Sequence, residues 1–183
     1  MFPLQAPRSR ANPASLASKV YRVLWWMAWL SLYRPTPRFL HAWRALLLRT
    51  FGATVGRGVH VYPKARIWAP CNLRMGDRSC LADGVNCYSV AEITLGEDTT
   101  ISQGAHLCSA SHDYTDVTFP LVAAPIAIGR SAWVAADAFI GPGVEIGEGA
   151  VVGARAVIVR DVQPWTVVAG NPARVLKARA RPS

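Results

Sequence analysis

The stretch from Val134 to Ile158 reads VAADAFIGPGVEIGEGAVVGARAVI and repeats every six residues. Glycine or alanine usually follows the aliphatic residue that opens each repeat. A six-residue period is typical of a parallel β-helix, in which each short strand stacks on its counterpart in the next coil. The pattern therefore predicts stacked coils rather than alternating helices and strands. The aliphatic positions in this stretch are Val134, Ile140, Ile146, Val152 and Ile158.

The same period extends from about residue 55 to about residue 175, with two slips of two residues. Three hexads make a coil of 18 residues, which stacks Val134 on Val152 and Ile140 on Ile158. Small residues four positions after the aliphatic one should share the interior, because stacked coils leave little room. The upstream aliphatic positions are Val55, Val61, Ile67, Met75, Leu81, Cys87, Leu95, Ile101, Leu107 and Ile128. The small interior positions include Ala65, Cys71, Ala132, Ala138, Ala150 and Ala156.

The expected fold class is an all-β solenoid with a short helical N-terminal extension. We divide the chain into an extension (1–50), a parallel β-helix (51–178) with an excursion loop at 113–125, and a tail (179–183). The four cysteines, Cys71, Cys80, Cys87 and Cys108, show no Cys-x-x-Cys spacing and are expected to be reduced.

The extension is basic and rich in tryptophan. Residues 1–50 hold eight Lys or Arg, and the first acidic residue is Asp77. The apolar run at 23–32 is too short to span a bilayer, which takes about 20 residues. Two roles stay open: a cap or subunit contact at the end of the β-helix, or peripheral membrane contact through residues 19–50.

A sequence pI near 10.0 suggests nucleic acid as a possible partner. No nucleic-acid-binding module is recognisable in the sequence, so we do not expect the protein to bind nucleic acid. A cleaved signal peptide is not expected either, because the basic start is not followed promptly by an apolar core and a cleavage site. The expected compartment is the cytoplasm, with the inner face of the membrane as a site of peripheral contact.

The repeat fails after His112, and the following segment must leave the coil as a loop. Function concentrates in loops that a rigid scaffold holds, and a histidine can exchange protons near neutral pH. His112 is therefore either a general base or a surface histidine beside a turn. A metal site formed with His60 and His106 is not expected, because His106 and His112 are six residues apart and fall on successive faces.

Several separated motifs show a resemblance to a known family. The hexads, Ser111-His112-Asp113-Tyr114, Ile128-Gly129-x-x-x-Trp133 and the closing Asp161-Val162-x-Pro164-Trp165 through Arg174 resemble the left-handed β-helix acyltransferases. Within them the chain is most similar to the galactoside, maltose and nodulation-type O-acetyltransferases, and to the colanic-acid-biosynthesis branch. The resemblance covers roughly residues 40–178 and implies a left-handed coil and a homotrimer.

The resemblance also implies roles for single residues. His112 matches the catalytic histidine, and Asp113 either orients it or fixes the loop turn. Asn86 and Asp83 are candidates for binding the acceptor sugar, with a turn role as the alternative for Asn86. The matches for acetyl-CoA are Trp133, the backbone at Ala136 and Ala154, and the basic residues Arg160, Arg174 and Lys177, although relatives often carry a hydroxyl at 136 and 159.

The expected function is therefore an acetyl-CoA-dependent O-acetyltransferase. Its substrate would be a sugar hydroxyl in exopolysaccharide or other surface-polysaccharide synthesis, with no metal. Two alternatives stay open: an N-acetyltransferase for amino sugars, and a non-catalytic β-helix that binds a membrane or a partner through residues 1–50. The sequence does not identify the acceptor hydroxyl or the length of the acyl group.

Overall fold

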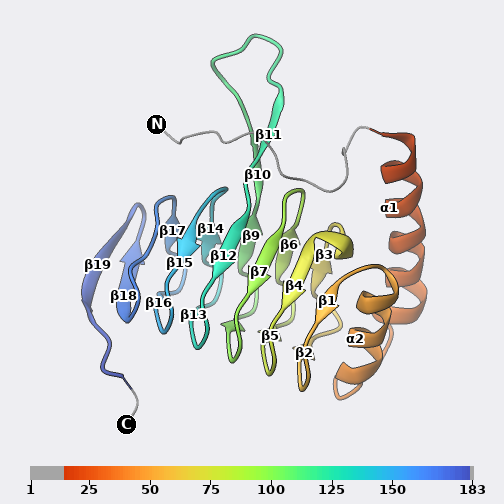
Figure 1. Ribbon diagram of the computed structural model, residues 1–183, viewed down its shortest axis with the longest axis horizontal. Helices are drawn as coiled ribbons and strands as arrows, with labels where there is room; N and C mark the ends of the chain where they lie inside the picture. The colour runs from red at the N-terminus through yellow and green to blue at the C-terminus, as the bar shows by residue number, and fades with distance from the viewer. Residues whose placement is uncertain (1–14, 182–183) are drawn as a thin grey trace.

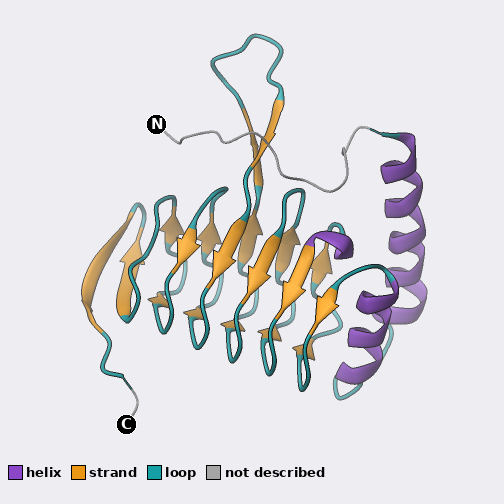
Figure 2. Cartoon of the chain, viewed as in Figure 1, coloured by secondary structure: helices purple, strands orange, loops and turns teal. Residues whose placement is uncertain are grey.

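The chain winds into a parallel β-solenoid with helices at its N-terminal end (Figure 1). The computed structural model describes residues 15–181, so the predictions for residues 1–14 and 182–183 lie outside it. Short strands follow one another along three faces, and each bonds to the strand of the next coil (Figure 2). The expected solenoid with a helical N-terminal segment is confirmed.

Each face is one sheet of short strands. The first face contains β1 (Thr54–Val55), β4 (Leu73–Met75), β7 (Ile93–Leu95), β12 (Ile126–Ile128) and β15 (Glu145–Ile146). The second contains β2 (His60–Val61), β5 (Cys80–Leu81), β8 (Thr100–Ile101), β13 (Trp133–Val134), β16 (Val151–Val152), β18 (Thr166–Gly170) and β19 (Ala173–Ala178). The third contains β3 (Arg66–Ile67), β6 (Asn86–Tyr88), β9 (His106–Cys108), β14 (Phe139–Ile140) and β17 (Val157–Ile158). All pairs within these faces are parallel except β18 with β19, which closes the C-terminal end as an antiparallel pair.

A column of aliphatic side chains fills the solenoid. All fifteen aliphatic positions named from the sequence pattern are buried. Val134 pairs with Val152 and Ile140 with Ile158, as the 18-residue period predicts. In the first coils the residues that pair in adjacent strands are instead 20 residues apart, as in Val61 and Leu81. Each two-residue slip in the six-residue pattern is therefore an insertion that lengthens a coil.

The prediction that Cys71 lies in the interior is wrong, because the first insertion falls at this residue. Pro70–Asn72 forms a short 3-10 helix, η2, that leaves Cys71 only partly buried. Asn72 turns inward instead, and its Nδ2 donates to the carbonyl oxygens of Ser89 and Val90 at 3.0 and 2.8 Å. All four cysteines are unpaired, as expected.

The N-terminal segment forms α1 (Leu16–Ala28), a π-helical turn η1 (Trp29–Tyr33) and α2 (His41–Thr50). Ser15 caps α1 by accepting a hydrogen bond from the Ser18 backbone N–H at 3.1 Å. Among residues 15–181, no helix has both the length and the apolar composition needed to cross a bilayer.

Tryptophans of the helical segment cover the open end of the third face. The carbonyl groups of an end coil have no further coil to pair with, and buried carbonyls need a donor. The indole N–H groups of Trp25 and Trp29 donate to the carbonyl oxygens of Ile67 and Ala65 at 2.7 and 2.9 Å. Both rings are buried, so they contribute apolar packing as well as hydrogen bonds.

Two arginines of α2 donate hydrogen bonds to the end carbonyl groups of the other two faces. Arg44 is fully buried, and its Nε donates to the Val61 carbonyl oxygen at 2.6 Å. Its Nη1 also donates to the Thr36 hydroxyl at 2.7 Å. Arg49 donates from Nη2 to the carbonyl oxygens of Val55 and Gly56 at 2.9 and 2.7 Å. The helical segment therefore caps the solenoid, which was the first of its two predicted roles.

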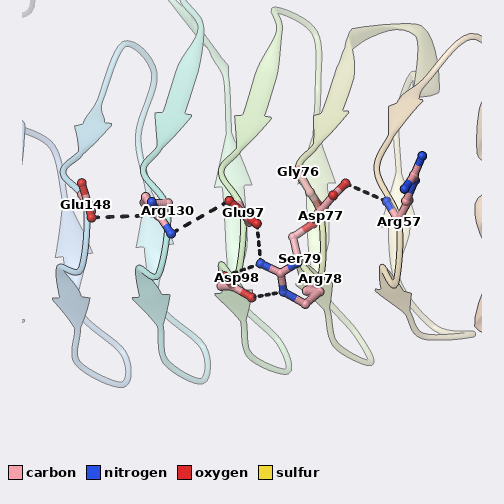
Figure 3. Close-up of polar contacts among 9 residues, drawn as sticks. All are labelled: Arg57, Gly76, Asp77, Arg78, Ser79, Glu97, Asp98, Arg130 and Glu148. Atoms are coloured by element: carbon pink, nitrogen blue, oxygen red, sulfur yellow. Dashed lines mark hydrogen bonds and ion pairs between the residues drawn. The ribbon is translucent and has the colours of Figure 1, made fainter. Parts of the chain in front are cut away.

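Exposed charges line the corner between the first and second faces (Figure 3). Arg78 lies 2.7 Å from Asp98 and also contacts Glu97, and Arg130 lies 4.0 Å from Glu97 and 3.9 Å from Glu148. Exposed pairs of this kind contribute little to stability, because solvent screens both charges. Backbone hydrogen bonds between stacked strands, rather than this ladder, fix the spacing between the coils.

Candidate active site

The repeat is interrupted where the sequence predicts. β10 (Ala110–His112) and β11 (Leu121–Ala123) pair antiparallel and carry the intervening loop away from the solenoid (Figure 1). The chain rejoins the first face in β12, at Ile126. A rigid scaffold therefore holds both strands at the base of an exposed loop.

His112 ends β10, and its side chain is exposed. Its Nδ1 lies 2.6 Å from the carbonyl oxygen of Phe119, across the base of the loop. A carbonyl oxygen only accepts hydrogen bonds, so Nδ1 is the donor and, in the neutral ring, Nε2 carries the lone pair. This orientation gives an imidazole that can take a proton from a hydroxyl brought to Nε2.

Asp113 is engaged in the loop itself. Its Oδ1 accepts hydrogen bonds from the Thr115 hydroxyl and backbone N–H at 2.6 and 2.9 Å. These two bonds hold the pKa of the Asp113 carboxyl below its usual range. Asp116 and Thr118 repeat the arrangement. Of the two roles considered for Asp113, the observed contacts correspond to the turn.

Asn86 lies exposed on the third face, in β6. Its Nδ2 is 3.3 Å from Nε2 of His106, the next residue in that ladder, and burial lowers the pKa of His106. Asn86 also borders a pocket of about 210 Å³. Apolar ring faces with a few polar groups are the usual lining of a small-molecule site. The other lining residues are Trp25, Trp26, Trp29, Arg66, Ile67 and Trp68, and none of them is predicted from the sequence as a ligand-binding residue.

Asp83 has structural contacts at the corner before β6. Its Oδ1 accepts a hydrogen bond from the Lys64 backbone N–H at 3.1 Å, and its Oδ2 lies 3.3 Å from Nη2 of Arg38. Both carboxylate oxygens therefore hold neighbouring backbone or the helical cap. These contacts leave Asp83 a weaker candidate for sugar binding than Asn86.

Trp133, Ala136 and Ala154 lie toward the C-terminal half of the solenoid. Trp133 is on the second face, about half exposed, and its Nε1 donates to the Ser102 hydroxyl at 2.9 Å. Ala136 and Ala154 occupy stacked turns in successive coils, and the Ala136 carbonyl oxygen accepts from the Arg155 N–H at 2.8 Å. The small side chains leave the turn at Ala154 exposed.

Arg160 and Arg174 share a groove at the C-terminal end. The groove has a volume of about 480 Å³ and lies between the segment 157–162 and the start of β19. Both guanidinium groups are exposed, and Arg174 donates to the Ala173 carbonyl oxygen at 3.0 Å. Lys177 is exposed further along β19, opposite Val167, and does not line the groove.

The structure therefore groups some predicted residues and separates others. Arg160 and Arg174 come together in the C-terminal groove, whereas Asn86 lies in an earlier coil and His112 at the excursion hairpin. The three histidines considered for metal binding lie on different sheets, and His60 packs against His41 with ring centroids 4.7 Å apart. Within residues 15–181, no three His, Cys, Asp or Glu side chains gather as metal ligands.

The stacked six-residue coils define the class of hexapeptide-repeat proteins. Residues 125–160 match the family described as bacterial transferase hexapeptide (six repeats). The chain is 42% identical over 156 residues to "Putative colanic acid biosynthesis acetyltransferase WcaF" of Escherichia coli K12, covering 85% of this chain and 86% of that protein. The chain belongs to this family of hexapeptide-repeat acetyltransferases and is an acyltransferase.

Two further acetyltransferases resemble this chain. Galactoside O-acetyltransferase of Escherichia coli K12 is 28% identical over 145 residues, covering 73% of this chain and 68% of that protein. A crystal structure of a hexapeptide-repeat acetyltransferase from Vibrio cholerae O1 biovar eltor, complexed with acetyl-coenzyme A, superposes with a TM-score of 0.82 at 26% identity. It covers 93% of each chain.

Proposed function

We propose that this protein transfers an acetyl group from acetyl-CoA to a sugar hydroxyl in the synthesis of a surface polysaccharide. The observation that carries the proposal is the orientation of His112, whose Nδ1 is bonded to the Phe119 carbonyl while Nε2 stays available. The relative named for colanic acid biosynthesis supports the substrate class, and the relative crystallised with acetyl-CoA supports the donor.

In this mechanism the acceptor hydroxyl attacks the thioester directly. Nε2 of His112 takes the hydroxyl proton as the oxygen forms a bond to the carbonyl carbon, whose π electrons move to the carbonyl oxygen. Backbone N–H groups would stabilise the resulting oxyanion. The carbonyl then re-forms, the C–S bond breaks, and the CoA thiolate receives the proton from Nε2. No serine or cysteine nucleophile is required.

The donor would lie along the C-terminal half of the solenoid. Arg160 and Arg174 offer two guanidinium groups in one groove, which suits the phosphates of CoA, and Lys177 adds charge on the same strand. The exposed turn at Ala154, stacked on Ala136, lets an extended chain pass close to the backbone. Trp133, whose ring is about half exposed, would lie near the thioester arm.

We further propose that a homotrimer completes the site. His112, Asn86 and the C-terminal groove are separated along one chain, and a neighbouring copy placed side by side would bring residues of one chain toward the hairpin of another. Asn86 would then bind the acceptor, with Asp83 in the weaker role described above. The unpaired cysteines fit a cytoplasmic protein.

The first test compares the intact protein with His112→Ala, using CoA release with a panel of mono- and oligosaccharides that includes amino sugars. We expect acceptor-dependent turnover to fall by about 10²-fold or more in the variant. His60→Ala is the matched control, because it removes another exposed imidazole far from the hairpin. Equal turnover in wild type and His112→Ala would show that the base is misassigned. Acetylation restricted to amino groups would instead support the N-acetyltransferase alternative.

A further inference from the structure

Two apolar stripes run along the N-terminal helix, which is α1 together with the turn η1. The inner stripe, with Trp25 and Trp29, packs on the first coil. The second, which we call the outer stripe, is exposed, although its residues recur at helical spacing as a buried face would. It consists of Leu16, Val20, Val23, Leu24, Met27 and Leu30, with exposed fractions between 46 and 77%.

A cationic and aromatic flank borders the outer stripe. Lys19, Arg22 and Trp26 follow one edge of it, and Trp26 is 57% exposed. The Arg22 guanidinium lies over the Trp68 ring, 4.4 Å from its centroid. These residues share a groove of about 560 Å³ with Val23, Met27 and Leu30. Apolar and cationic side chains thus face the same hollow.

The N-terminal part of the sequence that carries the stripe contains no acidic residue. No Asp or Glu precedes Asp77, while six Lys or Arg lie in residues 15–50. Arg44 and Arg49 are used inside the cap, and Arg38 pairs with Asp83. Lys19 and Arg22 lie beside the stripe, and Nη1 of Arg22 also donates to the Ser18 hydroxyl at 2.8 Å.

The position of α1 favours contact with an extended surface. The helix lies across the N-terminal end of the solenoid, and the excursion hairpin projects from the middle of the molecule (Figure 1). Docking at the end would leave the C-terminal groove open. A second copy is a poorer occupant of the stripe, because a symmetric contact would bring the same basic flank from both copies into one interface.

We propose that the outer stripe docks on the surface of an anionic lipid bilayer, with Lys19 and Arg22 at the level of the lipid phosphates and Trp26 at the interface. Helices with an apolar face, flanking cations and tryptophan lie in the plane of the bilayer surface rather than across it. Each cation near an anionic surface strengthens binding, so the interaction depends on lipid charge and on salt. Such docking would present the protein to acceptors carried at a membrane.

The test is co-sedimentation of the full-length protein with vesicles of phosphatidylcholine, with and without phosphatidylglycerol. We expect binding to the phosphatidylglycerol vesicles that weakens as salt rises, and little binding to phosphatidylcholine alone. Val23→Glu with Met27→Glu should lower the bound fraction by about tenfold or more, because both side chains would enter the apolar region. Both residues are more than half exposed, so the folded state loses little packing, which circular dichroism checks.

Val117→Glu with Leu176→Glu is the matched control, since both residues are exposed and lie outside the N-terminal helix. This control should bind as the wild type does. Two results would overturn the proposal: wild-type protein that stays in the supernatant with anionic vesicles, or a stripe variant that binds as well as wild type. A stripe variant that changes the mass in light scattering but not the vesicle binding would assign the stripe to a subunit contact and overturn it too. None of these readouts depends on acetyl transfer.

Discussion

At the scale of single residues, the contacts of Asp113 allow its two roles to be separated. Both hydrogen bonds of its carboxylate come from Thr115, and both are accepted by Oδ1. Asparagine offers the same Oδ1 acceptor without the charge and also favours such turns. We therefore expect Asp113→Asn to keep kcat/KM within about threefold, and Asp113→Ala to lower it further because the loop that places Phe119 loosens.

Steady-state kinetics on the acceptor found in the first test would measure both variants. Thermal melts serve as a control, since an exposed loop turn should hardly change the melting temperature. If Asp113→Asn lost activity as strongly as His112→Ala, the carboxylate charge would act on the base and the turn role would be insufficient.

The position of His112 at the base of the hairpin could be predicted from the sequence, whereas the hydrogen bond of its Nδ1 could not. The break in the six-residue period marks the hairpin, and the histidine stands at the break. The partner of Nδ1 is a backbone carbonyl seven residues later, which approaches only because β10 and β11 pair. The pocket beside Asn86 escaped prediction for a similar reason, because Trp26 and Trp68 meet there from distant parts of the chain.

At the scale of elements, the cap depends on side chains that end the sheets. Trp25→Phe keeps an aromatic ring but removes the donor to the Ile67 carbonyl. A buried carbonyl left without a donor costs about 1–3 kcal/mol, so we expect a loss of about 2 kcal/mol in the free energy of unfolding. Urea denaturation measures it, with Trp26→Phe as the exposed control expected to change stability by less than about 0.5 kcal/mol. Equal losses in the two variants would mean that the indole hydrogen bond contributes little.

Histidine at the cap makes stability depend on pH. Burial lowers the pKa of His41 from 6.5 against the hydrogen bond to Val61, which raises it, and the neighbouring Arg44, His60 and Arg38 also lower it. Burial lowers the pKa of His106 as well. Both histidines therefore bind protons more readily in the unfolded chain, so stability is lost as the pH falls. We expect the urea midpoint to decrease as the pH is lowered from about 7.5 to about 5.5, which is above the range where carboxyl groups titrate. His41→Asn with His106→Asn should flatten this dependence, and an unchanged slope would assign it to other groups.

At the scale of the whole molecule, the sequence predicts what repeats and misses what occurs once. Val61, Leu81 and Ile101 could be placed in one column because every coil imposes the same requirement on that position. The hydrogen bonds that Trp25 and Arg44 donate to the first coil occur only once, at the end of the solenoid. No repeated pattern in the sequence predicts them. Cys71 was misplaced because an insertion of two residues changes the face that a side chain points to.

The spacing between coils gives the last prediction. A Cβ added at Gly76 would lie 2.6 Å from the Glu97 nitrogen in the next coil, so Gly76→Ala must push two coils apart. We expect it to cost about 3 kcal/mol, the upper range for overpacking, because parallel strands on either side must shift together. Gly84→Ala is the matched control: its Cβ would have 3.7 Å to its nearest neighbour, but φ is +74°, so only backbone strain of about 1–2 kcal/mol is added. Urea denaturation of the two variants compares the effects, and a Gly84→Ala loss as large as that of Gly76→Ala would mean that turn geometry, rather than contact between coils, limits the stability of the solenoid.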